Sequence, residues 1–365
     1  MSRYNVGGTA QWLYQLSTGL TENNIANRML VGNCPEGELE DERISYINHR
    51  KIAGLGPGTN LAATLIAFFK IRGEIKKFRP DIVNTHTSKA GVIGRLAAKS
   101  VRPTPKVVHT YHGHVFYGYF NPTLEFAIKS LERILSKFTD TFFVLGAKVL
   151  EDLLKLHLVN TSNSHQVLPG VADPGKLDES DVRAQLGIKG DSFVVGWLGR
   201  KVPIKRIDRI LDLAELNPDI TFLLAGVGPK VTETYKDRFS KGNLSNVIEI
   251  GYATPSQVWS ASDICLITSD NEGIPTSSIE SALFEIPVVS TDAGSIRDVV
   301  VDKETGFICD SNIDSLSEAI RKLKSDPKLT KDMGINARRI ALIKFSPVSS
   351  VSSQIKGYEK TLGGI

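Results

Sequence analysis

One acidic stretch between two apolar runs constrains this chain more than any other feature. The runs, Ile264–Ile267 and Ile286–Val289, are short, continuous and rich in β-branched residues, as is typical of parallel strands that are covered on both faces. The stretch between them must therefore contain a loop and a crossover helix. Ser277, followed by Glu280, matches the capping-box pattern that opens a helix, and we expect this helix to end near Phe284. The pattern predicts an α/β fold in which the helix amino end, with its unpaired N–H groups, lies where open sheets bind anions.

Two glutamates in this stretch are candidate ligand-binding residues. Glu272 lies in the predicted loop, and Glu280 lies eight positions later in the first turns of the predicted helix. One interpretation is that the two carboxylates contact different parts of a single ligand. The other is that Glu280 only closes the capping box and that solvent surrounds Glu272. Their spacing alone favours neither interpretation.

The same residues resemble a known family. Glu272-Gly-Ile-Pro, with Glu280 after four further residues, and the following segment 284–292 resemble the signature of the retaining glycosyltransferases of family 4, which have the GT-B fold. The resemblance implies two Rossmann-like, doubly wound domains that face each other across a cleft. It also implies that Glu272 contacts the sugar of a nucleoside-diphosphate donor near the reacting carbon and that Glu280 binds the ribose hydroxyls. The diphosphate would lie against the helix amino end, which is formed by Gly273, Ile274, Pro275 and Thr276.

The chain departs from the family pattern at the end of this helix. Relatives usually carry glycine there, whereas this chain carries Glu285. If the left-handed helix end is kept, Glu285 carries a strain of about 1 kcal/mol, because only glycine adopts that conformation freely. The departure affects the local geometry and not the chemistry.

Length and composition restrict the class of protein. At 365 residues the chain is too long for one core of typical size, which predicts two domains. Its 44 basic and 40 acidic residues leave a net charge of +4, which is too small to indicate nucleic-acid binding. The three cysteines are widely spaced and indicate neither a disulfide framework nor a metal site. Because the sequence shows no signal peptide and no apolar run of roughly 20 residues, we expect a cytoplasmic protein.

The amino-terminal sequence predicts a glycine-rich turn that lacks the strand that normally precedes it. Asn5–Thr9 leads into a helix whose apolar face holds, at helical spacing, Trp12, Leu13, Leu16 and Leu20. Only Met1–Tyr4 precede this turn, although a strand of roughly 5–6 residues normally stands there. We therefore expect the first strand to be missing, through truncation or a wrongly chosen start codon. A central place in the sheet would then be empty or filled by a stub.

Strand-like and helix-like segments alternate through the first half of the chain. We expect helices at Leu61–Phe78 and Pro122–Phe138, and strands at Arg28–Val31, Ile82–Asn84, Val107–Thr110 and Thr141–Leu145. This alternation is typical of a parallel, doubly wound sheet.

Two motifs lie where predicted strands end. The first is the segment 84–91, and the second is the segment 109–120, which holds three histidines, at 109, 112 and 114, among aromatic residues. A buried histidine is more often a hydrogen-bonded core residue than a ligand, but three within six residues at a strand end favour a functional site. Metal binding is the less favoured alternative, because no acidic or cysteine residue stands at a ligand spacing.

These motifs also resemble the amino-terminal domain of a subset of the same family. The resemblance implies that His112 lies beside the donor sugar and that Gly7 and Gly8 approach the diphosphate from the opposite side of the cleft. The aromatic run 116–120 would then line the acceptor side. Relatives with lipid-linked acceptors rest a basic helix face on anionic lipid at the inner face of the membrane. The corresponding patch, for which a solvated face is the commoner alternative, comprises Lys70, Arg72, Lys76, Lys77 and Arg79.

A polar, turn-rich connection after residue 170 separates the predicted domains. We expect an acceptor-side domain at 1–170, a donor domain at 171–346 and a terminal helix at 347–365 that crosses back to the first domain. In the donor domain, Arg200 and Lys205 follow a predicted strand and can reach a phosphate from two directions. A basic loop without function is the alternative, but the pair also resembles the Arg and Lys that neutralise the leaving diphosphate in the family. Gly226-x-Gly228 is not a dinucleotide motif, because Pro229 follows and the third glycine is absent.

The whole sequence predicts a retaining, metal-independent glycosyltransferase of cell-surface glycan or glycolipid synthesis. It would move a sugar from a nucleoside-diphosphate donor to a hydroxyl of a glycan, lipid-linked or small-molecule acceptor. Arg200, Lys205 and the helix amino end would supply the positive charge that a metal ion supplies elsewhere. Because no carboxylate is a convincing nucleophile, we expect a same-face mechanism in which Glu272 orients the donor. The alternatives are a GT-B nucleotide-sugar epimerase, which consumes donor without an acceptor, and a non-catalytic nucleotide-sugar-binding paralogue, which the absent first strand would favour.

Overall fold

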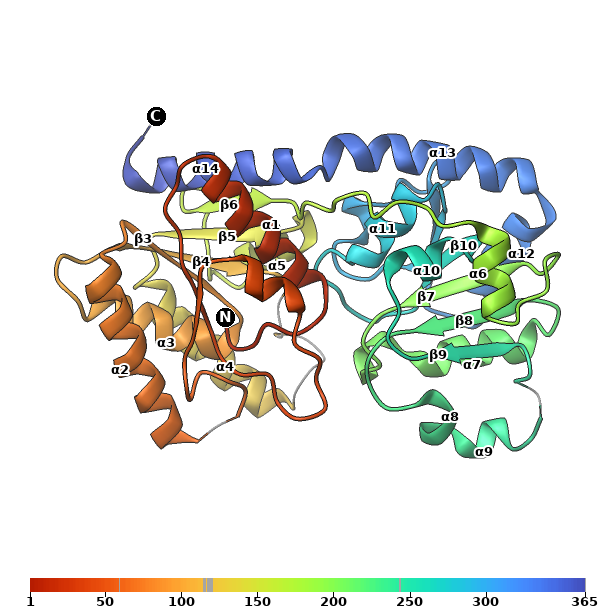
Figure 1. Cartoon of the computed structure of the whole chain (residues 1–365), viewed down its shortest axis with the longest axis horizontal. Coiled ribbons are helices and arrows are strands. Elements are labelled where there is room, and N and C mark those ends of the chain that lie inside the picture. The colour runs from red at the N-terminus through yellow and green to blue at the C-terminus, as the bar shows by residue number, and fades with distance from the viewer. Residues whose placement is uncertain (59, 114–115, 117–120, 243, 365) are drawn as a thin grey trace. The chain divides into compact units, whose positions relative to one another are not determined.

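The structure is a computed structural model, which describes residues 1–58, 60–113, 116, 121–242 and 244–364 (Figure 1). The chain divides into an amino-terminal unit, Met1–Gly170 with Pro347–Ile365, and a carboxyl-terminal unit, Val171–Ser346. Each unit contains parallel strands joined by helices, so the predicted α/β class is correct. Within the described residues, no helix combines the length and the apolar character that crossing a bilayer requires.

The carboxyl-terminal unit is built on a six-stranded parallel sheet in the order β12-β11-β10-β7-β8-β9. Its strands are β7 (Val194–Leu198), β8 (Thr221–Ala225), β9 (Val247–Ile250), β10 (Ile264–Ile267), β11 (Val288–Thr291) and β12 (Gly306–Cys309). The chain adds β8 and β9 on one side of β7, and then β10 to β12 on the other side. The direction of winding therefore reverses between β7 and β10, and open α/β sheets bind ligands outside the carboxyl ends of the strands at such a point.

Helices cover this sheet and enclose its core. They are α6 (Glu179–Gln185), α7 (Ile207–Leu216), α8 (Val231–Thr234), α9 (Lys236–Phe239), α10 (Pro255–Trp259), α11 (Thr276–Leu283), α12 (Ile313–Ser325) and α13 (Pro327–Lys344), with 3₁₀ turns η2 (Pro203–Lys205) and η3 (Ile296–Asp298). Helices α7 and α12 contact each other. The core between them and the sheet includes the fully buried Ile210, Leu211, Phe222, Leu224 and Ile320. This packing leaves the loops at the carboxyl ends of the strands free to form a site.

The amino-terminal unit contains two parallel sheets. The larger has the order β3 (Ile82–His86), β4 (Lys106–Tyr111), β5 (Thr141–Leu145), β6 (Ser164–Val167), and the smaller pairs β1 (Met29–Val31) with β2 (His49–Lys51). Its helices are α1 (Gly8–Glu22), η1 (Glu42–Tyr46), α2 (Leu61–Phe78), α3 (Ser88–Lys99), α4 (Pro122–Ser136), α5 (Ala147–Lys155) and α14 (Pro347–Leu362). Helix α14 contacts both α1 and β6 (Figure 1). Gly19 of α1 permits this, because a Cβ there would lie 2.6 Å from the side chain of Val351.

The first residues lie between the two sheets of this unit. The amino group of Met1 donates to the carbonyl oxygen of Leu30 at 2.8 Å, and Gly32 N–H donates to the Met1 oxygen at 3.1 Å. Ser2 N–H donates to Thr87 Oγ1 at 3.2 Å, directly after β3. Residues 1–4 form no strand of their own. They occupy the place between β1 and β3 as a short stub.

Most predicted element positions are correct, and one boundary that differs is informative. Helix α2 and strands β5 and β10 have the predicted bounds, and the helical region breaks between α13 and α14 as expected. The strand expected at 286–289 begins two residues later, as β11. Ile286 N–H bonds to Ser281 O at the end of α11, and Pro287 has no N–H to give to a ladder.

Candidate active site

The amino end of α11 has no side-chain cap, so the predicted capping box is wrong. The helix begins at Thr276 and Pro275 is its N-cap. Ser277 therefore lies inside the first turn, whereas a capping residue must have non-helical backbone angles. The backbone N–H groups of Gly273, Ile274 and Thr276 have no partner among the described residues. These donors, together with the helix dipole, form a site that favours an anion.

Glu272 is held in place and is not surrounded by solvent. Its Oε1 accepts a hydrogen bond from Ser269 Oγ at 2.6 Å and also pairs with Lys205 Nζ. Its side chain is 12% exposed. The backbone of this loop is held by Ser295 N–H, which donates to Gly273 O at 3.0 Å. Gly294, at φ 57, lies so close that a Cβ there would be 1.8 Å from Glu272 O.

The structure brings Lys205 and Glu272 together at the point where the winding reverses. Lys205 ends η2 after β7, and Glu272 follows β10, the neighbouring strand. Thr268 Oγ1 donates to Lys205 O at 2.8 Å and so ties the two loops to each other. Arg200 also follows β7, but its side chain is exposed and has no hydrogen bond or ion pair within the described chain. Glu280, on α11, is 5% exposed.

A glycine turn supports the loop that carries Arg200. Gly226, at φ 133, would place a Cβ 1.8 Å from Gly199 O, and Lys201 N–H donates to Val227 O at 2.9 Å. The Gly226-x-Gly228 segment, which the sequence excluded as a dinucleotide motif, thus forms the strand-to-helix turn between β8 and α8. Lys201, which the sequence did not single out, pairs with the half-buried Glu249 at 2.6 Å. Burial would raise the pKa of Glu249, but Lys201 and backbone N–H groups at the start of α8 hold it below its ordinary value.

The predicted residues of the amino-terminal unit gather around Trp12. Gly7, at φ 150, is the N-cap of α1, and no side chain caps this helix. Trp12, on α1, places its ring edge to face with His112 (centroids 4.9 Å apart) and with His86 (5.7 Å). His86 Nδ1 and His112 Nε2 lie 3.0 Å apart and share a hydrogen bond. His86 was part of the sequence motif but had no predicted role.

Burial determines the charge of these histidines. It lowers the pKa of His112 to about 3, helped by repulsion from the charged amino terminus, and lowers the pKa of His86 well below its ordinary value, helped first by repulsion from a charged His112. His109 is a structural residue: it is 3% exposed and its Nδ1 bonds to Thr85 Oγ1 at 2.8 Å. His114 and residues 117–120 of the predicted acceptor-side run lie outside the described residues. In the part of the chain that is described, no three His, Cys, Asp or Glu side chains gather as metal ligands.

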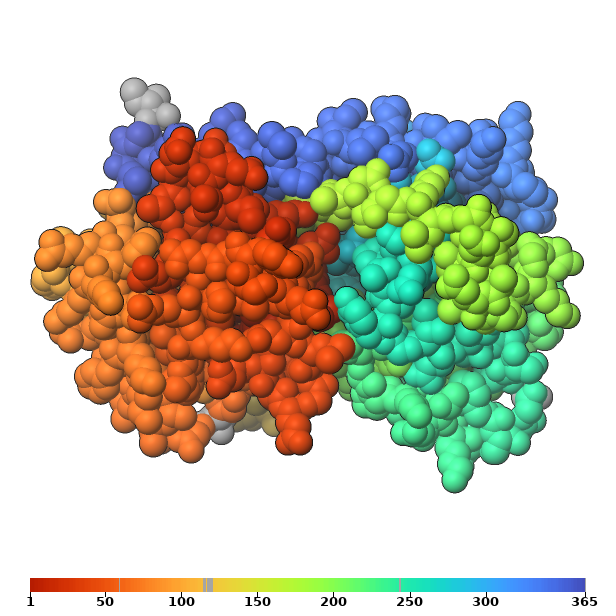
Figure 2. Space-filling model, viewed as in Figure 1, coloured from red at the N-terminus to blue at the C-terminus, as the bar shows by residue number. Residues whose placement is uncertain are grey.

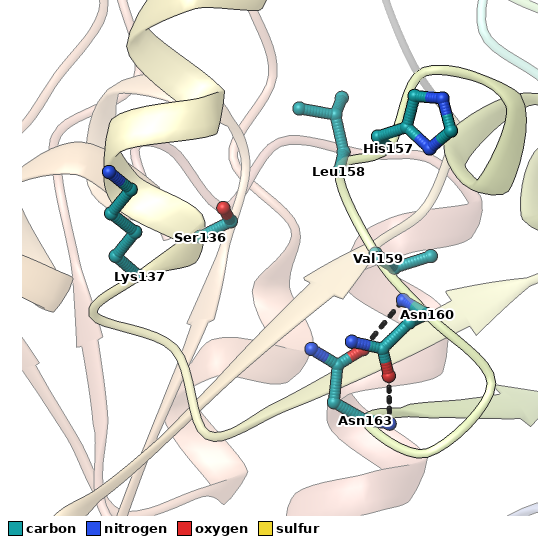
Figure 3. A pocket seen from close by; sticks show the side chains of 7 residues that line it. All are labelled: Ser136, Lys137, His157, Leu158, Val159, Asn160 and Asn163. Atoms are coloured by element: carbon teal, nitrogen blue, oxygen red, sulfur yellow. Dashed lines mark hydrogen bonds between the residues drawn. The ribbon is translucent and has the colours of Figure 1, made fainter.

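A surface pocket of about 310 Å³ lies elsewhere in the amino-terminal unit (Figure 3). Its residues precede β5 and β6, so it lies at the amino ends of these strands, whereas the predicted site residues lie at the carboxyl ends. In Figure 3, the side-chain oxygens of Asn160 and Asn163 accept from one another's backbone N–H groups. The lining residues are Ser136, Lys137, His157, Leu158, Val159, Asn160 and Asn163. None of them is a predicted site residue.

Two family models match the chain. Residues 6–173 match the model described as Glycosyltransferase Family 4, and residues 178–340 match the model described as Glycosyl transferases group 1. The chain belongs to the family 4-like glycosyltransferases. The resemblance and the GT-B architecture inferred from the sequence are therefore correct. Retention, and the roles of individual residues of this glycosyltransferase, stay predictions.

Similar proteins are found across its length. UDP-Gal:alpha-D-GlcNAc-diphosphoundecaprenol alpha-1,3-galactosyltransferase of Escherichia coli is 28% identical over 302 residues, which are 79% of this glycosyltransferase and 76% of that protein. The capsular polysaccharide biosynthesis glycosyltransferase CapM of Staphylococcus aureus is 26% identical over 349 residues, which are 90% of this chain and 88% of that protein.

Two solved structures share the fold. Sucrose-phosphate synthase of Thermosynechococcus elongatus has a TM-score of 0.85 at 18% identity, with 98% and 94% covered. Anabaena HepE, in complex with UDP and glucose, has a TM-score of 0.83 at 20% identity, with 99% and 98% covered.

Proposed function

We propose that this glycosyltransferase transfers a sugar from a UDP-sugar to an acceptor hydroxyl, with retention, in the synthesis of a cell-surface glycan. The observation that carries the proposal is the Lys205–Glu272 pair beside the uncapped amino end of α11, at the point where the sheet reverses its winding. The names of the E. coli and S. aureus relatives, with a UDP-galactose donor and a capsular product, support the substrate class. The complex of HepE with UDP supports the nucleotide.

The donor's diphosphate would bind where positive charge is available. Lys205 supplies an ammonium group, the exposed Arg200 supplies a guanidinium fork, and the N–H groups at the start of α11 supply the helix dipole. Negative charge grows on the diphosphate as the bond between the sugar C1 and the diphosphate oxygen breaks, so these groups stabilise the transition state more than the bound donor. This charge supply makes a metal ion unnecessary in the proposed reaction.

The proposed reaction proceeds on one face of the sugar. The diphosphate oxygen leaves with the bonding electron pair, the acceptor oxygen bonds to C1, and the acceptor proton passes to the departing diphosphate. Glu272, held by Ser269 and Lys205, would orient the sugar, and Glu280 would bind the ribose hydroxyls. His112 would lie beside the sugar. Glu272→Ala should reduce turnover strongly, and near-normal turnover would remove Glu272 from the mechanism.

Product analysis tests the proposal. UDP-hexoses are incubated with polyprenyl-diphosphate-linked sugars, the acceptor class that the name of the E. coli relative indicates. We expect a product whose anomeric configuration, measured by NMR, equals that of the donor, and a large loss of turnover in Arg200→Ala. Arg339→Ala is the matched control, because Arg339 is exposed and lies on α13 away from these loops. An inverted product would overturn retention, and an epimerised nucleotide sugar formed without acceptor would favour the epimerase.

We also propose that α2 rests on anionic lipid when the acceptor is lipid-linked. Three large apolar side chains of α2, one helical turn apart, are exposed: Leu61 by 79%, Leu65 by 59% and Phe69 by 63%. The helix lies on the outer surface of its unit, in orange (Figure 2). The basic residues Lys70, Arg72, Lys76 and Lys77 of this helix, and Arg79 directly after it, form no ion pair within the described chain. Apolar side chains beside unpaired basic residues are typical of helices that lie in an anionic membrane surface.

Vesicle binding tests this membrane contact. The protein should sediment with phosphatidylglycerol vesicles and not with phosphatidylcholine vesicles, and Phe69→Ser or Lys76→Glu should weaken sedimentation. Leu177→Ser is the control, because Leu177 is an exposed leucine, 48% accessible, of the carboxyl-terminal unit. Sedimentation that these α2 variants leave unchanged would contradict the proposal.

A further inference from the structure

His86 and His112 form a hydrogen-bonded pair at the ends of neighbouring strands. His86 ends β3 and His112 follows β4, and the two strands are adjacent and parallel. The His86 Nδ1 to His112 Nε2 distance is 3.0 Å. His86 is 7% exposed, whereas His112 is partly exposed. The pair therefore presents one ring to the surroundings and keeps the other inside the unit.

The backbone holds His86 at this position. Thr87, the next residue, has φ 66 and ψ 158, a region that is costly for a β-branched residue, by about 1–3 kcal/mol. The contacts of Thr87 Oγ1 with Ser2 N at 3.2 Å and Ser2 Oγ at 2.9 Å keep it there. Trp12 packs edge to face against both imidazoles. Strain of this kind persists where the surrounding structure fixes a functional geometry.

The chemistry of two neutral imidazoles links their tautomers. Only one proton can lie between His86 Nδ1 and His112 Nε2. If His112 Nε2–H is the donor, both rings have the Nε2–H form, which is the more stable tautomer of a neutral histidine side chain. His112 Nδ1 then carries a lone pair and accepts hydrogen bonds. This atom has no partner within the described residues, so it is available to a hydroxyl group.

We propose that His86 is a positioning residue that accepts a hydrogen bond from His112 Nε2–H and so presents His112 Nδ1 as an acceptor for a hydroxyl of the donor sugar. The proposal rests on the proposed function for the identity of that hydroxyl. The pairing of the two rings does not depend on it. His86 itself would contact no substrate.

Nitrogen NMR tests the pairing without any nucleotide. The full chain is labelled with ¹⁵N-histidine, and the coupling across the N–H···N hydrogen bond is measured. We expect a coupling between His112 Nε2, which carries the proton, and His86 Nδ1, and its loss in His86→Leu. A proton on His86 Nδ1, or no coupling in the wild type, would overturn the proposal.

Kinetics test the positioning role, with the UDP-sugar that binds in calorimetry as the probe. In His86→Leu we expect kcat to fall by about tenfold, the change that corresponds to one hydrogen bond of ordinary strength, while KM for the donor stays within about twofold. His86→Asn should restore most of kcat, because its amide oxygen can accept from His112 Nε2–H. Failure of Asn to restore kcat, in a variant that melts like the wild type, would count against the hydrogen bond.

His109→Asn is the matched control. His109 is also a buried histidine of these two strands, but it bonds to Thr85 and not to His112. It should lower the melting temperature and leave kcat of the folded protein unchanged. An equal loss of kcat in His109→Asn would show a merely structural effect. If the wild type shows the coupling but binds no UDP or UDP-sugar, the proposed function fails and the pairing stands; the reverse result overturns the pairing alone.

Discussion

At the scale of single residues, Glu285 keeps the backbone conformation of the family pattern although it replaces the glycine of that pattern. It adopts φ 62, the left-handed conformation expected from the glycine that relatives carry. The conformation is kept because α13 passes close by, where a Cβ on Gly334 would lie 1.9 Å from Glu285 O. Glu285 also pairs with Lys176 at 3.0 Å, but both side chains are more than 40% exposed, so this pair adds little.

Glu285→Gly should therefore stabilise the protein. Relief of the left-handed strain is expected to raise the free energy of unfolding by about 1 kcal/mol, measured by urea denaturation. Glu285→Ala is the control, because it removes the same ion pair and keeps the Cβ. If the glycine variant is no more stable than the alanine variant, the strain is absent.

The Lys205–Glu272 pair leads to a second prediction. In the ligand-free protein Lys205 is bound to a carboxylate, which a diphosphate must displace. Glu272→Gln should bind UDP a few-fold more tightly than the wild type, because a partly buried pair of roughly 1 kcal/mol no longer competes, and yet turn over donor slowly. Calorimetry with UDP measures the first effect. Weaker UDP binding in Glu272→Gln would show that Lys205 does not exchange partners.

At the scale of elements, a buried ionic network fixes α4. Arg95 of α3 donates to both oxygens of Glu132 of α4, at 2.8 and 2.9 Å, and Tyr111 Oη of β4 donates to Glu132 at 3.1 Å. Arg95 is 0% exposed and Glu132 is 6% exposed. Burial and the Glu132 carboxylate raise the pKa of Tyr111 well above its ordinary value. The network therefore joins three elements next to the strand end that carries His112.

Removing one charged partner of this network should destabilise the protein. Glu132→Ala is expected to lower the free energy of unfolding by about 3–5 kcal/mol, because it leaves the Arg95 charge buried without a partner. The double variant Arg95→Met with Glu132→Leu should recover most of that loss, since it removes both charges. Urea denaturation compares the variants. A double variant as unstable as the single one would mean that packing, and not charge, carries the effect.

The sequence patterns predicted the positions of helices and strands more accurately than the residues at which these elements begin and end. The predicted strand at 264–267 and the predicted helix at 61–78 are correct because the spacing of apolar residues along the sequence is enough to predict them. The capping box failed because the N-cap is Pro275, two residues before the serine that the pattern takes as the cap, and local composition cannot show that. The pairing of Lys205 with Glu272 was not predictable, because it depends on strand order. The role of His86 depends likewise on β3 lying beside β4.

At the scale of the whole molecule, all seven histidines of the chain precede residue 171, and His86, His109 and His112 lie buried or half-buried in or directly after β3 and β4 of the amino-terminal unit. Burial lowers the pKa of His86, His109 and His112 below the ordinary value of 6.5. In the unfolded chain these rings take up protons first as the pH falls. Their contribution to stability is therefore fully present above about pH 6.5 and is lost progressively as the pH falls toward about 3.

Acidification should consequently unfold the amino-terminal unit first. Hydrogen exchange followed by mass spectrometry, at pH values from 7 to about 5, reports on the two units separately. We expect protection to fall in Met1–Gly170 and to stay nearly constant in Val171–Ser346, which has no histidine. His109→Gln should reduce the pH dependence in the first unit. Equal loss of protection in both units would contradict this account.

The central claim is that the loops after β7 and β10, with the start of α11, form the site for a nucleoside-diphosphate sugar. Calorimetric titration of the full chain with a set of nucleoside-diphosphate sugars tests it most directly, with Arg200→Ala and Glu280→Gln as site variants and Arg339→Ala as the control. We predict that one donor binds, that both site variants lose this binding by tenfold or more, and that the control keeps it. Binding that survives both site variants, or no binding of any donor by the folded chain, would contradict the account.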